Sequence, residues 1–284
     1  MRIDLHSHSN ASDGTQPPAD VVRRARERGL DVLALTDHDT VAGHREAAAA
    51  LPGGLTLVPG MELSCRRGEQ GIHLLAYLFD PAEPELRAEC VRLREARETR
   101  ARLTVERLAE LGVPVTWAQV AELAAGGPVG RPHIARAMVA AGAIAAPDLA
   151  FTPEWIGTGG RAHVNRYALD PGRAVRLVRA AGGVPVLAHP KAARRGPAVP
   201  DEWIAELAAA GLFGVETDHL DHDGPARARL RGLAGELGLA VTGSSDDHGE
   251  LTGHRLGCET TDPEVYERLL AEATGATPIS ARPG

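Results

Sequence analysis

The chain is poor in aromatic residues, in cysteine and in long apolar runs, and each shortage excludes a class of protein. Only 3% of its 284 residues are Phe, Trp or Tyr, so stacking surfaces for a long nucleic-acid strand are scarce. The three cysteines form no C-x-x-C pair, which argues against a disulfide framework and a thiolate zinc site. No run approaches the ~18 apolar residues of a membrane helix, and the first residues lack the apolar core of a signal peptide. We therefore expect a cytoplasmic protein that makes no contact with a membrane.

Lysine is also scarce: Lys191 is the only lysine, and arginine supplies the other positive side chains. The formal net charge of −7 argues against a broad basic face for nucleic acid, since phosphate-backbone binding needs clustered Lys and Arg. A small anionic substrate in a locally positive pocket is compatible with this balance. With 43% hydrophobic and 24% charged residues, the composition is that of an ordinary globular protein.

Short apolar runs alternate with helical patterns in two parts of the chain, 1–82 and 162–284. In the first part "RIDLH", "DVLALT", "LTLVPGMELS" and "GIHLLAYLF" read as strands, with helices at about 17–29 and 41–50. In the second, "VPVLAH", "FGVET", "LAVTGSS" and "RLGCET" alternate with helices at 171–182, 201–210, 224–237 and 263–273. This alternation predicts a parallel sheet or barrel wrapped by helices. Residues 83–161 lack strand signals and predict an inserted helical subdomain, and only the tail "ATPISARPG" looks loose.

Histidine and carboxylate residues stand at the ends of these strands, or within them. In parallel sheets and barrels, ligands bind at the carboxyl ends of the strands. Imidazole and carboxylate together suit Zn²⁺, Mn²⁺ and Fe²⁺. The residues are too many for one ion and predict two or three divalent ions that share bridging carboxylates. The predicted metal ligands are His6, His8, Asp13, His38, Glu62, His73, His189, Asp246 and His248.

A single histidine is more often a surface or core residue than a metal ligand. For that reason we set aside His44, which lies in a helical run, and His254, which lies between a strand and a loop. His163 and His219 stay undecided.

Six motifs follow one another along the chain: "DLHSHSNASDG", "LALTDHDT", "PGMELS", "IHLLAY", "VLAHP" and "TGSSDDHG". In order and approximate spacing they resemble the motifs of the PHP family, the polymerase and histidinol phosphatase domain. The segment "GRPHIAR" looks like the branch of small bacterial phosphoesterases that act on nucleotides, which includes 3′,5′-bisphosphate nucleotidases and a 5′-to-3′ exoribonuclease. The family pattern has an aromatic residue between the last Asp and His, where this chain has Asp247.

The resemblance implies an α/β fold, a distorted (β/α)7 TIM-like barrel with an inserted helical subdomain, and a trinuclear metal site. It also implies which residues hold each ion. The sets are His6, His8, Glu62 and Asp246 for one ion, Asp13, His38 and His248 for a second, and Glu62, His73 and His189 for a third. The expected reaction is hydrolysis of a phosphate monoester of a small nucleotide by a metal-activated hydroxide.

Further residues are predicted to assist that reaction. Asp37 would orient a ligand, and Asp39 or His222 would act as a general acid. Phosphate contacts are expected from cations and from a helix N-terminus. The predicted contacts are Arg131 and His133 in the insertion, Lys191 and Arg194 after "AHP", and His222.

Other functions stay open at this point. Within the family, the alternatives are a 5′-to-3′ exoribonuclease acting on short oligonucleotides and a histidinol-phosphatase-like enzyme. An amidohydrolase-type barrel also begins with His-x-His, but no lysine is placed to be carbamylated, because Lys191 follows "AHP" within a loop. A catalytically silent metal-binding regulatory domain is the non-enzyme alternative. No obligate protein partner is indicated.

Overall fold

The computed structural model describes residues 1–124, 127, 129–192 and 196–281. The chain forms two compact units, one of Met1–Cys90 with Leu169–Gly284 and one of Val91–Ala168. The expected subdomain, 83–161, begins and ends several residues earlier than the second unit. The difference arises at α3 (Pro84–Glu110), a continuous helix that starts in the first unit and ends in the second.

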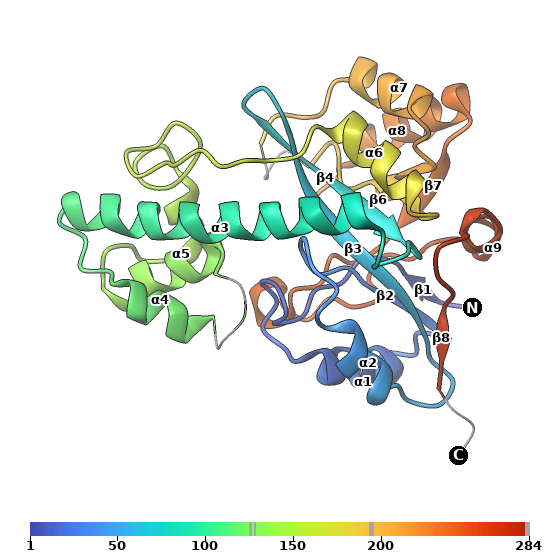
Figure 1. The fold of residues 1–284 in the computed structure, drawn as a ribbon, viewed down its shortest axis with the longest axis horizontal. Coiled ribbons are helices and arrows are strands. Elements are labelled where there is room, and N and C mark those ends of the chain that lie inside the picture. Colours follow the sequence, from blue (N-terminus) through green and yellow to red (C-terminus); the bar gives the residue numbers. More distant parts are fainter. Residues whose placement is uncertain (125–126, 128, 193–195, 282–284) are drawn as a thin grey trace. The chain divides into compact units, whose positions relative to one another are not determined.

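The first unit is built on one curved sheet, drawn mainly in blue, teal and orange in Figure 1. Its strands follow one another along the sheet in the order of the sequence. A bridge between Ser7 and Asp247 joins the segments that follow the first and last strands, so the sheet nearly closes into a barrel. The strands are β1 (Ile3–Asp4), β2 (Val32–Leu35), β3 (Thr56–Arg67), β4 (Gln70–Tyr77), β5 (Val184–Leu187), β6 (Gly214–Asp218) and β7 (Ala240–Gly243).

One strand breaks the expected parallel pattern. β4 is antiparallel to both β3 and β5, whereas the other neighbours along the barrel are parallel. The two-residue connection Gly68–Glu69 lets the chain turn straight back, and Gly68 has a φ of 57°, which favours glycine. The barrel is therefore mixed, and its β3–β4 hairpin replaces one β-helix-β unit.

Helices connect the remaining strands of this unit, close to the predicted positions. They are α1 (Pro18–Glu27), α2 (His44–Ala49), α6 (Pro171–Ala180), α7 (Asp201–Ala209), α8 (Gly224–Leu237) and α9 (Pro263–Glu272). Three begin at aspartates whose side chains accept hydrogen bonds from backbone N–H groups of the first turn: Asp170, Asp223 and Asp262. Such caps account for helix starts that are visible in the sequence.

Two expectations for the last part of the chain are wrong. The segment "RLGCET" forms turns and no strand. The tail is ordered in part, because β8 (Ile279–Ser280) pairs with the start of β3, with Ile279 opposite Leu57. Short polar segments depend on such distant partners, which local patterning does not reveal.

The second unit has a hydrophobic core of its own. Most of α3 packs with α4 (Trp117–Leu123), α5 (Arg131–Ala140) and the 3₁₀ turn η1 (Pro147–Phe151) around buried side chains such as Leu108, Val120, Ile134 and Met138. Thr116 and Gln119 form a reciprocal capping box at the start of α4. Across the described part of the chain, no helix has the length and apolarity required to cross a membrane.

Candidate metal centre and active site

The structure brings all nine predicted metal ligands into one cluster. The segments after β1, β2, β5 and β7 carry most of them, so the parallel strands deliver these side chains at their carboxyl ends. Glu62 and His73 instead lie within the hairpin strands β3 and β4. The nine residues are linked by imidazole–carboxylate contacts of 2.8–3.7 Å around the three carboxylates Asp13, Glu62 and Asp246.

Glu62 is the central carboxylate of this cluster. Its side chain is 1% exposed, and both of its oxygens are surrounded by imidazole nitrogens. His73 Nδ1 is the nearest, at 2.8 Å from Oε1. The other nitrogens lie 3.1–3.3 Å from one oxygen or the other and belong to His6, His8, His38 and His189. A carboxylate with this many donor groups around it is suited to bridge ions.

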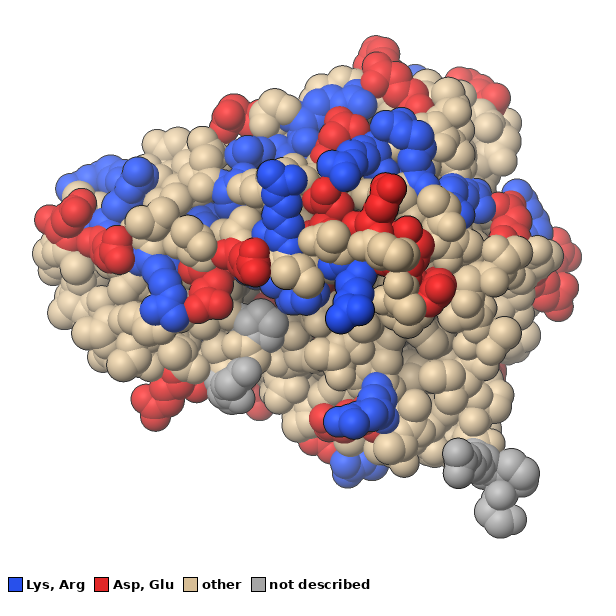
Figure 2. Space-filling view, viewed as in Figure 1, with Lys and Arg blue, Asp and Glu red and all other residues tan. Residues whose placement is uncertain are grey.

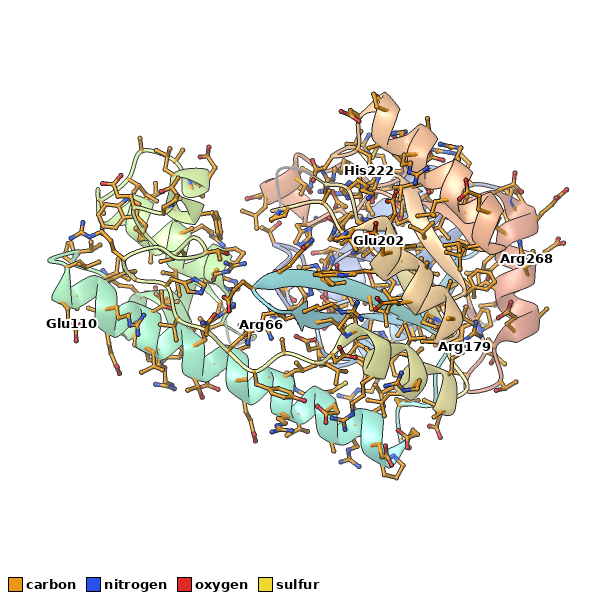
Figure 3. The ribbon with its side chains drawn as sticks, turned by 90° about the horizontal axis from the view of Figure 1, so that it is seen from above. Arg66, Glu110, Arg179, Glu202, His222 and Arg268 are labelled. Carbon is orange, nitrogen blue, oxygen red and sulfur yellow. The ribbon has the colours of Figure 1, made fainter. Side chains whose placement is uncertain are left out.

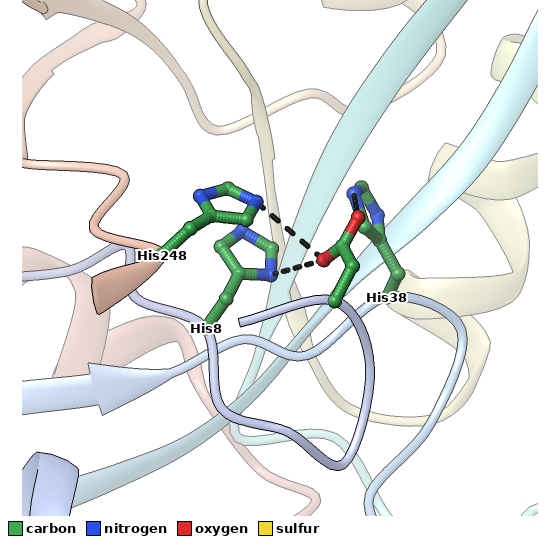
Figure 4. Close-up of side chains that lie close together, drawn as sticks. His8, His38 and His248 are labelled. Carbon is green, nitrogen blue, oxygen red and sulfur yellow. Dashed lines mark ion pairs between the residues drawn. The ribbon is translucent and has the colours of Figure 1, made fainter. Parts of the chain in front are cut away.

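Asp13, in the loop that precedes α1, is the centre of a second group of imidazoles, shown in Figure 4. Its Oδ1 atom lies 3.7 Å from His8 Nδ1 and 3.5 Å from His248 Nε2, and its Oδ2 atom lies 3.7 Å from His38 Nε2. The turn that returns Asp13 to His8 requires glycine at its end, because a Cβ on Gly14 would lie 2.7 Å from the His8 carbonyl oxygen. Asp13 therefore reaches the site from a loop.

Asp246 is the third carboxylate and is fully buried. Its Oδ1 atom lies 3.3 Å from His6 Nε2, 3.1 Å from His8 Nε2 and 3.5 Å from His248 Nδ1. The Asp246 N–H donates to the His6 carbonyl, so the segments after β1 and β7 hold each other in register. His8 thus lies next to all three carboxylates.

The hydrogen-bond partners of His6 indicate that a proton or a metal ion lies in this cluster. His6 Nδ1 lies 3.1 Å from Glu216 Oε1, and because a carboxylate accepts, the His6 proton lies on Nδ1. The Nε2 lone pair then faces the carboxylates of Glu62 and Asp246 and lies 3.1 Å from His8 Nε2. Converging lone pairs and carboxylates repel one another unless a proton or a metal ion lies between them. The mixed imidazole and carboxylate donors fit a divalent transition metal.

Three groups of donor atoms in the described part of the chain have the spacing of metal sites, with the atoms of each group within 4.8 Å of one another. They are His6, His8, Glu62 and Asp246; His8, Asp13, His38 and His248; and His38, Glu62 and His73. The first equals the set implied by the resemblance, and the second adds His8 to the implied set. The third has His38 where the resemblance implies His189, which lies against Glu62 all the same.

The carboxylates and imidazoles shift one another's pKa values strongly. Burial alone would lower the pKa of His8, but hydrogen bonds to Asp246 and Glu62 raise it to about 10. Burial would raise the pKa of Glu62, yet His38, His73 and His6 hold it well below its usual range. For Asp13, burial is likewise outweighed by His38 and His248, which lower its pKa. Without metal, the site would therefore hold protons where the ions bind.

Backbone strain is concentrated at this site. Among the described non-glycine residues, five have a positive φ, and three of these are Asp39, His189 and Asp246, at 56°, 27° and 49°. A non-glycine residue in this region costs roughly 1–3 kcal/mol and persists where the surroundings hold it. The chain turns sharply at these positions after β2, β5 and β7, and the turns direct His189 and Asp246 into the cluster and Asp39 towards Ser64.

Glu216, in β6, is a site residue that the sequence reasoning missed. Besides His6, its carboxylate accepts hydrogen bonds from the His189 N–H, at 2.8 Å, and from the hydroxyl of Ser244. It therefore fixes the ring of one predicted ligand and the backbone of another. The available signal was a glutamate inside the apolar strand "FGVET", a position where a charge is buried only if it is paired.

His219, which the sequence left undecided, lies outside the three donor groups but touches one of them. Its Nδ1 atom accepts from the Asp221 N–H, which leaves the proton on Nε2, 3.4 Å from Asp246 Oδ2. His219 thus supports the face of Asp246 that points away from the imidazoles.

The carboxylates of Asp37 and Asp39, both predicted to be catalytic, are engaged with serines. Asp37 accepts from the N–H and hydroxyl of Ser9 and from the hydroxyl of Ser12, at 2.6–2.8 Å. Asp39 accepts from the N–H and hydroxyl of Ser64, at 2.7 and 2.8 Å. Both are fully buried. These contacts hold the loops that carry the ligands, which suits the orienting role expected for Asp37.

His222 and Lys191, predicted substrate contacts, order the loop after His189. His222 lies beyond β6 (Figure 3); its Nδ1 donates to the Thr217 carbonyl and its Nε2 accepts from the Lys191 N–H. The Lys191 ammonium donates to Asp201 and to the Val199 carbonyl, at 2.6 Å each. Both ring nitrogens of His222 are thus occupied by backbone groups. Arg194 lies outside the described residues.

Arg131 and His133 lie in the second unit, at the N-terminus of α5. His133 Nδ1 accepts from the Gly130 N–H at 3.0 Å, so its proton lies on Nε2. The Arg131 guanidinium lies over the Phe151 ring, 5.6 Å from its centroid. Burial, with the nearby charge of Arg97, lowers the pKa of Arg131. Both side chains thus bring donors to the positive end of a helix.

An α/β barrel whose strands deliver imidazoles and bridging carboxylates to one cluster defines a metal-dependent hydrolase, and comparison with known proteins gives its class. The PHP domain model matches residues 4–107. A 5′-3′ exoribonuclease of Haemophilus influenzae is 34% identical over 87% of this chain and 90% of its own length. A 3′,5′-nucleoside bisphosphate phosphatase of Chromobacterium violaceum is 33% identical over 95% of both chains.

A solved structure agrees with these relatives. The chain superposes with a TM-score of 0.89 and 33% identity, over 96% of both chains, on a Bifidobacterium adolescentis protein provisionally described as a metal-dependent phosphoesterase. The chain belongs to the PHP domain family, and it is a metal-dependent phosphoesterase. The fold, enzyme class and family expected from the sequence are confirmed.

Proposed function

We propose that the protein hydrolyses a phosphate monoester of a small nucleotide, with two or three divalent ions held by the nine clustered residues. The observation that carries this proposal is Glu62, a buried carboxylate with imidazole nitrogens on both oxygens. Mn²⁺, Zn²⁺ and Fe²⁺ are the ions that such mixed donors suit. When bound, they would lower the pKa of water towards neutrality and neutralise the oxygens of the ester.

The chain's own residues hold this arrangement in place. Glu216 keeps the His6 ring turned so that Nε2 faces Glu62 and Asp246, where it would bind an ion, and it fixes the backbone of His189. Asp37 and Asp39 hold the ligand loops through Ser9 and Ser64. No side chain is required to attack phosphorus, and we assign His222 to ordering the loop after His189. Mutation of residues that orient metal ligands commonly lowers metal affinity or activity by about 10–100-fold.

Charge favours a small anionic substrate over a long nucleic-acid strand. On the face drawn in Figure 2, basic and acidic side chains are interspersed, without one continuous basic surface. The two units nevertheless differ, because residues 91–168 hold ten arginines against seven acidic residues in a chain with a net charge of −7. This positive balance is compatible with the proposal that Arg131 and His133 contribute to the recognition of substrate phosphate.

A second candidate is 5′-to-3′ exoribonuclease activity on short oligonucleotides, favoured by the similarity to the Haemophilus influenzae enzyme. The two activities share the metal site and differ in the bond that breaks. A phosphatase releases inorganic phosphate, whereas an exoribonuclease releases mononucleotides.

The experiment that tests this proposal is a substrate panel applied to protein of known metal content. It contains nucleoside 3′,5′-bisphosphates, nucleoside monophosphates, histidinol phosphate, an amino-sugar phosphate and a short 5′-phosphorylated oligoribonucleotide, with Mn²⁺ added. We expect inorganic phosphate from the nucleotides. Mononucleotides from the oligoribonucleotide alone would favour the second candidate, and a fully metallated protein that cleaves none of the panel would sink both.

Arg131→Met is expected to raise KM for the nucleotide substrate about tenfold or more with a smaller change in kcat. A charge-assisted hydrogen bond contributes roughly 1.5–3 kcal/mol to binding. If Arg131 binds a phosphate that is not cleaved, its loss weakens the ground state and the transition state equally, so KM rises and kcat changes less. Steady-state kinetics measure the split. Arg136→Met, on the same helix and also half-buried, is the matched control. Equal KM values for the two variants would remove Arg131 from the substrate contacts.

A further inference from the structure

Asp247 differs from the ligands on either side of it, because its side chain turns away from the metal cluster. It is 1% exposed and belongs to none of the three donor groups found among the described residues. Its Oδ1 atom accepts from the Arg255 N–H at 2.6 Å and from the Thr252 hydroxyl at 3.1 Å, and its Oδ2 atom accepts from the Gly249 N–H at 3.1 Å. Asp247 thus holds together, by hydrogen bonds, the turn that follows the predicted ligands Asp246 and His248.

The same turn is tied to the backbone of the ligand segment. The Thr252 hydroxyl, which donates to Asp247, accepts from the His248 N–H at 2.8 Å. The 3₁₀ turn η3 (Gly249–Thr252) begins at once after His248. Removing the Asp247 carboxylate would leave the buried Gly249 N–H and the half-buried Arg255 N–H without this acceptor, which costs more than the loss of an exposed hydrogen bond.

Arg255 is the residue through which this turn reaches the metal site. Its Nη2 atom donates to the Asp246 carbonyl at 3.0 Å and lies 3.5 Å from Asp246 Oδ2. The guanidinium therefore lies on the outer oxygen of Asp246, while Oδ1 faces His6 and His8. It is 14% exposed, so solvent screens the contact only in part.

We propose that Asp247 and Arg255 form a brace that positions Asp246 for metal binding. The inference rests on the proposed role of Asp246 as a ligand and extends it to two residues that do not touch the ions. Asp247 fixes the backbone of Arg255, and Arg255 holds the outer oxygen and the carbonyl of Asp246. The backbone of Asp246 has a positive φ of 49°, a strained conformation that needs such support.

The brace gives Asp247 a defined role where the family pattern has an aromatic residue. All three described partners of its carboxylate belong to its own turn, in Gly249, Thr252 and Arg255. The extra negative charge is thereby stabilised by hydrogen bonds within the turn. We therefore assign Asp247 no role in binding the substrate or the ions.

The test measures Mn²⁺ binding by titration calorimetry and bound metal by elemental analysis, with no dependence on catalysis. Arg255→Met is expected to weaken the affinity of at least one ion about 10–100-fold, the range found for residues that orient ligands. Arg255→Lys, which keeps the positive charge, should lose less. Arg179→Met is the matched control, because Arg179 likewise donates to a carbonyl, that of Gly211, and pairs with a carboxylate, that of Glu272, in a region without predicted ligands.

A double-mutant cycle separates the brace from general loss of structure. Asp247→Ala and Arg255→Met should each weaken Mn²⁺ binding, and the double variant should lose little more than the worse single variant. Thermal unfolding of the metal-free variants reports their folding, and if Arg255→Met fails to fold, Arg255→Lys and Asp247→Asn carry the cycle.

The outcomes are distinct for the brace and for the ligand set. Wild-type protein that takes up no Mn²⁺, Zn²⁺ or Fe²⁺ would overturn the ligand set and the brace together. Wild-type protein that binds Mn²⁺ with the same affinity as Arg255→Met, or effects that simply add in the cycle, would overturn the brace alone.

Discussion

A Glu62→Gln variant is expected to lose phosphoesterase activity by about a thousandfold or more and to bind fewer metal ions. The amide has one acceptor oxygen and no charge, whereas Glu62 places imidazole nitrogens within 3.3 Å of both carboxylate oxygens. Ions placed by such a bridge supply several kcal/mol of transition-state stabilisation, and each 1.36 kcal/mol is a factor of ten in rate. Phosphate release and metal content, measured on the same preparation, check both parts of this expectation.

Glu89→Gln is the control for the loss of a buried carboxylate. Glu89 is 6% exposed and pairs with Arg173, so its replacement also removes a buried charge from an ion pair. We expect this variant to keep its metal content and its rate. If Glu62→Gln retained full activity and a full complement of metal, Glu62 would not be the bridge, and the centre would have to be rebuilt around Asp13 and Asp246.

The clustering of the predicted ligands could be foreseen because most of them follow strands that the sequence shows clearly. His6, His38 and His189 each come shortly after an apolar run, and parallel strands bring their carboxyl ends to one edge. The sequence therefore indicated which residues meet, without the distances between them. Imidazole and carboxylate types then narrowed the chemistry to transition metals.

The parts that were missed depend on partners distant in the sequence. The sequence shows Glu216 as a charged residue inside an apolar strand, but its partner His6 lies 210 positions away. β4 keeps a strand pattern whether it runs parallel or antiparallel, so its direction follows from the short turn at Gly68 and from pairing with β5. Ile279 likewise forms a strand only because the start of β3 offers an unpaired edge. Local propensity carries no information on such pairings.

The number of protons that the metal-free site holds determines how metal binding depends on pH. Without metal, Asp246 and Glu62 raise the pKa of His8 from 6.5 to about 10, so its ring is protonated at neutral pH. A raised histidine pKa stabilises the folded state fully below about 6.5, and this contribution is lost as pH rises towards 10. The lowered pKa values of Asp13 and Glu62 change the stability of the folded state only in acid, below the usual carboxylate range. Between pH 6.5 and 10 the pH dependence of stability therefore comes from the histidines.

Metal affinity should therefore rise with pH between about 7 and 9, by about tenfold per pH unit for each proton that an ion displaces. His8 lies in two of the three donor groups, so its proton must leave before either group takes an ion. Mn²⁺ titrations in buffers of different ionisation enthalpy count the protons released. Over the same pH range the Tm of the protein that a chelator has freed of metal should fall as the pH rises. The reason is that the folded state loses its advantage over the unfolded state in binding that proton. The metal-loaded protein should not show this fall, since the ion has already replaced the proton. An affinity that stays constant from pH 7 to 9 would mean that the imidazoles are neutral before metal arrives, and that the carboxylates hold no proton in place of the ions.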